Sequence, residues 1–110
     1  MIDNATFQII GRIGNINTSD KVTRISLATD RPVKGEQDNW TTKTNWLSVT
    51  VFNEALRKRL KNSKVGKKGN KLIVQGSLQE NNYEKNGETI YTTNLVAQDF
   101  DVIAFTSDSK

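Results

Sequence analysis

Short runs of β-branched and apolar residues, divided by polar segments, recur along the chain, and this pattern predicts mainly β-strands. The runs FQIIGRIGNI (7–16) and VTRISLAT (22–29) are rich in β-branched and apolar residues, and the polar NTSDK between them is typical of a turn. Gly11 and Gly14 interrupt the first run, which predicts a bend or a bulge there. The chain is therefore expected to begin with two strands, the first of them bent.

A third strand is predicted at NWLSVTVFN (45–53). The preceding segment, DRPVKGEQDNWTTKT (30–44), holds the only proline and many polar residues, so a long loop or a loose hairpin is expected there.

The third strand has two unlike faces if it is extended. One face is apolar and suits a core, whereas the other carries hydroxyl groups between two large aromatic rings. The apolar face is Leu47, Val49 and Val51, and the mixed face is Trp46, Ser48, Thr50 and Phe52.

One short helix is predicted at EALRKRLKN (54–62), where Ala55, Leu56 and Leu60 form a narrow apolar stripe. Asn53 precedes it and is a favoured N-cap residue. This is the only helix that the pattern indicates.

Two further strands are expected after the helix. KLIVQGSLQ (71–79) has a strand pattern, and Asn86-Gly87 is a strong hairpin signal because a type I′ turn needs positive φ at both central positions. The last strand, from Thr89 to Phe105, is long enough to bend and close a barrel.

The predicted order is three strands, a short helix and two strands. This is the order of the all-β, five-stranded Greek-key barrel called the OB-fold, with its helix between strands 3 and 4. A generic five-stranded barrel stays open as an alternative. We expect one domain over residues 1–105 and a short flexible C-terminal tail over 106–110.

Composition narrows the function classes. The chain has no cysteine and no histidine, so thiolate chemistry, disulfides and the commonest general base are missing. It also lacks a signal-peptide pattern and any apolar run long enough to span a membrane, and we expect a cytoplasmic, nucleoid-associated protein. We expect no enzyme, no metal site and no cofactor. A carboxylate-dependent nuclease is the enzymatic alternative, and the acids that it would draw on are Asp99, Asp101, Glu80, Glu84 and Glu88.

Cations are unevenly distributed along the chain, whose net charge is +4. Residues 54–71 hold eight Lys and Arg residues against the single acid Glu54. Such a segment fits a polyanionic partner, although a solvated basic face is the alternative.

The mixed face of the third strand admits two interpretations. Trp46 and Phe52 can belong to a protein interface, or they can be a platform on which the bases of single-stranded nucleic acid stack. Tyr83 lies near the predicted hairpin turn and Trp40 in the polar segment 30–44, without a local reason to be buried. Rings for bases together with cations for phosphates favour single-strand binding, and RNA stays open beside DNA.

The chain also resembles a known family. FQIIGRIG, RISLAT, NWLSVTVFNEAL, KKGNKLIVQGSL and ETIYTTNLVA are similar to the successive blocks of bacterial single-stranded DNA-binding proteins, over nearly the whole chain. The resemblance implies an OB-fold that binds single-stranded DNA without sequence preference in replication, recombination and repair. It also implies a homo-oligomer, usually a tetramer, with a dimer possible.

The resemblance places the family's stacking aromatics on Trp46, Phe52 and Tyr83, with Tyr where Trp is usual. Its basic pair falls on Lys67 and Lys68. Trp40 lies in the segment where the family often has a further Trp, although not at the same position. The complete set of expected site residues is Trp46, Phe52, Tyr83 and Trp40 for base stacking, and Lys67, Lys68, Lys43, Arg12 and Arg24 for phosphate contacts.

Two departures from the family shape the expectations. The arm after the fourth strand, usually rich in Lys and Arg, contains Gln79, Glu80, Asn81 and Asn82, and the chain ends at Lys110 without the acidic, hydrophobic tip that recruits replication proteins. We therefore expect no recruitment through such a tip, and a bacterial, phage or plasmid origin. A tail-less primosomal accessory protein of the same fold and a protein-interaction module are the alternatives.

Overall fold

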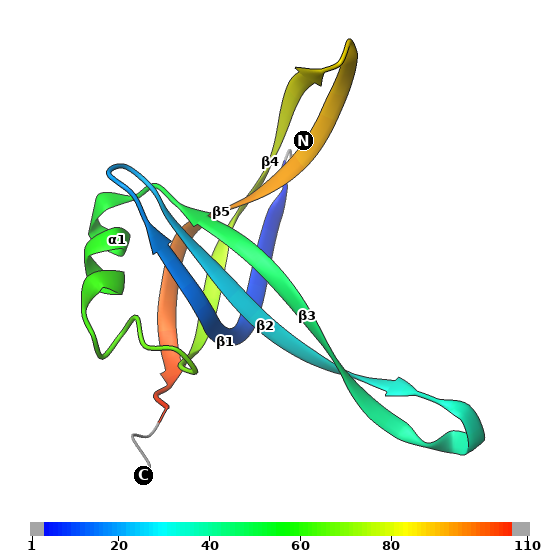
Figure 1. Cartoon of the computed structure of the whole chain (residues 1–110). Helices are drawn as coiled ribbons and strands as arrows, with labels where there is room; N and C mark the ends of the chain where they lie inside the picture. The colour runs from blue at the N-terminus through cyan, green and yellow to red at the C-terminus, as the bar shows by residue number, and fades with distance from the viewer. Residues whose placement is uncertain (1–3, 107–110) are drawn as a thin grey trace.

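The chain forms a closed β-barrel in which the strands follow one another in the order β1–β2–β3–β5–β4 (Figure 1). The computed structural model describes residues 4–106. All strand pairs are antiparallel except β3 with β5, which pair in parallel. The predicted all-β OB-fold with one helix between strands 3 and 4 is confirmed. Its elements are β1 (Thr6–Thr18), β2 (Thr23–Lys34), the 3-10 turn η1 (Glu36–Asp38), β3 (Trp40–Val51), α1 (Glu54–Lys61), β4 (Lys71–Lys85) and β5 (Glu88–Ala104).

Strand β1 bends because it serves two neighbours. Residues Thr6 to Arg12 pair with β4, and Arg12 to Thr18 pair with β2, with a bulge between Ile13 and Ile16. A Cβ on Gly11 would lie 2.7 Å from the carbonyl oxygen of Ala28, so the bend needs a residue without a side chain. The predicted irregularity in this strand is confirmed.

The core fills the barrel with side chains from all five strands and the helix. Val49 and Val51 are fully buried and Leu47 packs against the core at partial exposure, as their shared strand face predicted. Helix α1 covers one end of the barrel (Figure 1) with Leu56 and Leu60, one turn apart. The buried apolar residues are Ile9, Ile13, Ile25, Leu27, Val49, Val51, Leu56, Leu60, Leu72, Val74, Ala97 and Phe100.

The helix begins where the sequence predicts. The Asn53 side chain accepts a hydrogen bond from the Leu56 N–H at 3.1 Å, which satisfies one of the free donors of the first turn. Ala55 is exposed, so its assignment to the apolar stripe was wrong. An eight-residue helix covering a barrel end buries only the two residues that share its inner side.

Two long hairpins project from the barrel in different directions (Figure 1). The β2–β3 arm (residues 30–44) is paired as far as Lys34 opposite Trp40, so the hairpin alternative is confirmed and Trp40 lies in a strand rather than a loop. Pro32 is tolerated because the arm is a two-stranded ribbon with free outer edges. The β4–β5 arm (residues 79–93) turns at Asn86 and Gly87, both with positive φ (54° and 82°), as the hairpin signal predicted.

The ends of the chain carry the remaining predictions. The Thr106 N–H donates to Asn70 Oδ1 at 2.8 Å, and the rest of the predicted tail, 107–110, lies outside the described residues. The single domain over 1–105 stays a prediction. Within residues 4–106, no helix is long and apolar enough to cross a membrane.

Candidate nucleic-acid interface

Three aromatic rings lie along one face of β3. Trp40 and Trp46 lie in β3 and Phe52 follows its last residue, all three on the same face, and they are 65%, 62% and 57% exposed. At about 3.3 Å per residue, successive rings are separated by about 20 Å along the strand. We call Trp40, Trp46 and Phe52 the aromatic track.

Small residues make the floor beneath the central ring. Trp46 lies opposite Ala28 of β2, and its ring extends to Gly14 of β1. Because neither neighbour has a side chain longer than a methyl group, the indole can lie against the barrel wall and still keep much of its surface open. This geometry suits a stacking platform.

The ring at the barrel end is held through its backbone. Arg57 of α1 donates to the Phe52 carbonyl oxygen from Nε at 3.2 Å and to the Asp20 carbonyl oxygen at 3.1 Å. One guanidinium thus joins the helix, the end of β3 and the β1–β2 turn. Phe52 therefore projects from a fixed part of the main chain.

An open groove of about 410 Å³ lies beside the track. It runs between the outer face of β3 and the root of the β4–β5 arm, and its walls are mainly hydroxyl and amide groups, with the Phe52 ring at one side. Arg24 lies opposite Thr50 in the strand register and contributes the one cation of the lining. The lining residues are Arg24, Ser48, Thr50, Phe52, Gln79, Asn81, Thr93, Asn94, Leu95 and Val96.

Tyr83 extends this surface along the β4–β5 arm. It shares a strand face with Asn81 and Gln79, both of which line the groove, and it is 51% exposed. The arm carries a second exposed ring, Tyr91, opposite Asn82 and so on the other face of the ribbon. Tyr91 was missed in the sequence, although its place in the polar arm beside the predicted Asn86-Gly87 turn is the same signal that indicated Tyr83.

The expected phosphate contacts are dispersed. Arg24 lines the groove, whereas Lys43 lies between Thr42 and Thr44 in β3 and so on the face away from the rings. Lys67 and Lys68 lie in the loop between α1 and β4, which is tied to β1 where the Gly69 N–H donates to the Ile13 carbonyl oxygen at 2.9 Å. Only some of the cations predicted to contact phosphates therefore lie near the aromatic track.

Arg12 is close to the track but is engaged by an acid. Its guanidinium lies 3.3 Å from a carboxylate oxygen of Asp30. Asp30 also accepts a hydrogen bond from the Thr44 hydroxyl at 2.7 Å. These contacts could not be predicted from sequence, because they join three strands.

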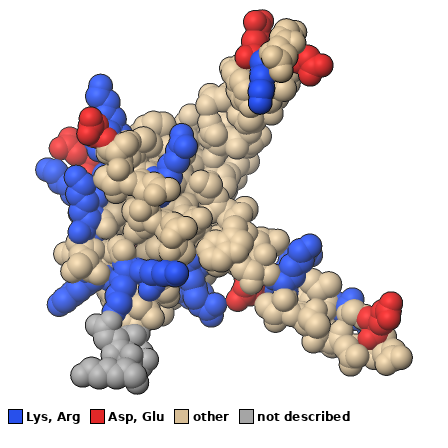
Figure 2. Space-filling view, in the orientation of Figure 1, with Lys and Arg blue, Asp and Glu red and all other residues tan. Residues whose placement is uncertain are grey.

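Charge is unevenly distributed over the surface (Figure 2). Most Lys and Arg side chains gather over α1 and the neighbouring end of the barrel, with a few acidic side chains among them, and acidic side chains lie at the ends of both arms together with Lys or Arg. The β4–β5 arm carries Glu80, Glu84 and Glu88 against Lys85. An arm of this charge does not attract phosphate.

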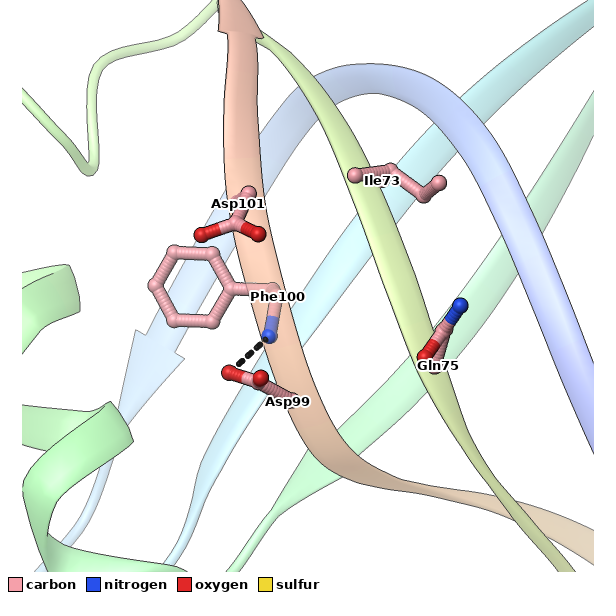
Figure 3. Close-up of a pocket in the computed structure, with 5 residues that line it drawn as sticks. All are labelled: Ile73, Gln75, Asp99, Phe100 and Asp101. Atoms are coloured by element: carbon pink, nitrogen blue, oxygen red, sulfur yellow. Dashed lines mark hydrogen bonds between the residues drawn. The ribbon is translucent and has the colours of Figure 1, made fainter.

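The acids considered for a nuclease lie outside the groove. Asp99 and Asp101 face outward from β5 beside Ile73 and Gln75 of β4, around a hollow of about 90 Å³ (Figure 3). Arg59 lies 4.0 Å and 3.8 Å from the two carboxylates, and its guanidinium stacks 4.2 Å from the centre of the Phe100 ring. Among residues 4–106 no group of three acids could hold a metal ion.

Comparison with known proteins gives a consistent result. Residues 5–103 match the model of the Single-strand binding protein family. A single-stranded DNA-binding protein of Rickettsia felis is 33% identical over 106 residues, which cover 92% of this chain and 68% of that protein.

Two solved structures have the same fold. The mitochondrial single-stranded DNA binding protein of S. cerevisiae has a TM-score of 0.71 and 25% identity, and the match covers 96% of this chain and 100% of that one. An SSB of Plasmodium falciparum, solved in complex with single-stranded DNA, has a TM-score of 0.70 at 22% identity, with 97% of this chain and 98% of that chain covered.

Proposed function

The chain belongs to the single-strand binding protein family, and from this membership we propose that it binds and protects single-stranded DNA without sequence preference. Replication, recombination and repair are the processes in which such binding is used. The bases stack on Trp46, Phe52, Trp40 and Tyr83, and Arg24 and other cations contact the phosphates.

The aromatic track is the observation that carries this proposal. Its three rings are more than half exposed and share one face of β3 and its end, and Phe52 borders a polar groove. Stacking on a ring is open to every base because each has a π-face, and it contributes about 1–3 kcal/mol per base. A row of such rings therefore gives affinity without sequence readout.

Stacking is proposed to supply a larger share of the affinity than phosphate contacts do. Arg12 is ion-paired, Lys43 lies on the other face, and the β4–β5 arm is acidic. Each phosphate neutralised by a cation steepens the dependence of log K on log salt by about 0.7 for single strands. The salt dependence of binding is therefore expected to be shallow.

Titration with oligo(dT) tests the function. Binding should quench the fluorescence of Trp40 and Trp46, with the quench reduced in Trp46→Ala. Absence of both quenching and a gel shift at low salt would contradict the proposal, and salt-insensitive binding to a protein instead would favour the interaction module. Comparing the affinities for DNA and RNA oligomers of the same length measures whether the protein prefers deoxyribose or ribose.

We also propose that the protein is a homo-oligomer, a tetramer or a dimer. The outer face of β1, β4 and β5 carries Ile10 (46% exposed) opposite Ile73, and Ile103 (51% exposed) further along β5. Association would remove this apolar surface from water. The mass in solution should exceed that of one chain, and Ile10→Lys should lower it.

Action by binding alone, without catalysis, completes the proposal. Asp99 and Asp101 are engaged by Arg59 on the far side of β5 from the barrel interior. Labelled oligo(dT) incubated with the protein and Mg²⁺ should remain intact. If Mg²⁺-dependent cleavage persists after the protein is purified again, the proposal that it acts without catalysis is contradicted.

A further inference from the structure

Arg12, Asp30 and Thr44 lie on the same surface as the aromatic track. Arg12 of β1, Ala28 of β2 and Trp46 of β3 are successive register partners, so they form one row across three strands. Asp30 and Thr44 form the next outward pair on β2 and β3. Thr44 lies between Trp46 and Trp40 along β3 and on the same strand face, because side chains two positions apart share a face. Asp30, its partner on β2, therefore lies on this face at a level between the two Trp positions.

The Asp30 carboxylate is held from two sides. One oxygen lies 3.3 Å from the Arg12 guanidinium, and the other accepts the Thr44 hydroxyl hydrogen bond at 2.7 Å. The side chains of Arg12 and Asp30 are 59% and 40% exposed, so the pair is open to solvent. A strand of DNA that follows the track from Trp46 to Trp40 must pass over it.

We propose that Asp30 is an affinity-setting residue that withholds Arg12 from the DNA backbone. This inference rests on the proposed function. While the carboxylate occupies the guanidinium, a phosphate at this point meets a neutral pair and gains no contact. Without that carboxylate, Arg12 becomes a phosphate-binding cation in the middle of the track.

The surroundings of the pair support this assignment. A hollow of about 160 Å³ lies beside it and is bordered by Arg12, Asp30 and Lys71, and Lys71 is the register partner of Arg12. Of the described residues, two cations and a single acid, Asp30, thus border this space. An exposed ion pair contributes little to stability, so its removal should leave the barrel folded.

The test counts phosphate contacts from the salt dependence of oligo(dT) binding. Four proteins are compared: the unchanged chain, Asp30→Asn, Arg12→Gln and the double variant. Asp30→Asn should steepen the slope of log K against log salt by about 0.7, the value of one added contact on a single strand. Its affinity at low salt should rise on the order of fivefold.

Arg12→Gln separates the proposal from a general charge effect. In the unchanged background it should leave the slope as it is, whereas in the Asp30→Asn background it should remove the added 0.7. Glu54→Gln is the matched control, because it also neutralises an acid of an exposed ion pair (Lys58 to Glu54, 3.6 Å), and it should leave the slope unchanged.

Two results would overturn the inference while single-strand binding itself stands. One is an unchanged slope in Asp30→Asn, and the other is a slope that Arg12→Gln lowers equally in both backgrounds, which would mean that Arg12 already contacts phosphate. If the unchanged chain itself fails to bind oligo(dT), the proposed function fails, and this inference with it.

Discussion

The indole ring of Trp46 occupies the space that a side chain on Gly14 would need. A Cβ built on Gly14 would overlap Cζ3 of the ring, although the two residues belong to different strands with β2 between them. The glycine is therefore required by a side chain rather than by a turn.

Gly14→Ala should lift the Trp46 ring from its floor while leaving the barrel folded. Since a stacked base is worth about 1–3 kcal/mol, partial loss of the platform should weaken oligo(dT) binding by about 1 kcal/mol, or roughly fivefold. Fluorescence in a Trp40→Phe background reports on Trp46 alone. Gly35→Ala in the β2–β3 arm is the control, and equal losses in both variants would contradict the contact.

The spacing of the rings should appear in the length dependence of binding. A separation of about 20 Å corresponds to about six nucleotides at a rise of 3.4 Å per nucleotide, and to fewer if the strand is extended. Trp40→Ala should therefore weaken binding of long oligo(dT) by about 1–3 kcal/mol but leave oligomers of about six nucleotides nearly unaffected. Trp46→Ala should weaken both, and a Trp40 effect independent of length would argue against a continuous track.

Arg57→Met should loosen the end of β3. The substitution removes the hydrogen bonds to the Phe52 and Asp20 carbonyl oxygens and keeps much of the aliphatic stem. We expect a loss of about 1–2 kcal/mol in unfolding free energy by urea titration, together with a roughly threefold loss of oligo(dT) affinity. Lys58→Met is the neighbouring control, and unchanged affinity in Arg57→Met would show that Phe52 is held without it.

Asn70→Ala should destabilise the barrel more than any of these changes. Asn70 is fully buried, and its side chain donates to the carbonyl oxygens of Lys64 and Val65 and accepts the Thr106 N–H. Its removal leaves three backbone groups without that partner, at an expected cost of about 3 kcal/mol. Thermal and urea unfolding measure it, and a loss no greater than that of exposed Asn17→Ala would contradict the role.

Thr23→Val should stabilise the protein. Thr23 is 1% exposed, and within the described part of the chain its hydroxyl has no hydrogen-bond partner. Replacing a buried, unsatisfied hydroxyl with a methyl group of the same shape should raise the unfolding free energy by about 1 kcal/mol. Thr29→Val, which removes a hydroxyl placed 3.5 Å from the Asn45 carbonyl oxygen, should bring no such gain.

Local patterns predicted much of this fold. The alternation in 45–53 placed Val49 inside and Trp46 outside, and the turn at Asn86-Gly87 and the cap at Asn53 are where short-range chemistry places them. The extension of strands through 30–44 was only half predicted, because a polar, threonine-rich ribbon has no buried face and so no hydrophobic alternation to show it.

The site was less predictable because charge pairing depends on strand register. Arg12 and Asp30 are 18 positions apart in the chain, and only the pairing of β1 with β2 brings them together. Lys43 was expected to contact phosphate beside the rings. It lies one position from Thr42 and Thr44, which share the face of the rings, so its own side chain is on the opposite face. Residue type indicated which groups could bind DNA, whereas three-dimensional pairing determined which of them are available.

The aromatic track also limits how this chain can change length. Trp40, Trp46 and Phe52 share a face because each lies six positions, an even number, from the next. One residue inserted between Trp40 and Trp46 would turn Trp40 to the face of Lys43, whereas two would leave it in line. We therefore expect this part of β3 to tolerate insertions and deletions only of an even number of residues. The tip of the arm at 35–39 lies outside the aromatic track, so a change of length there can be of any number.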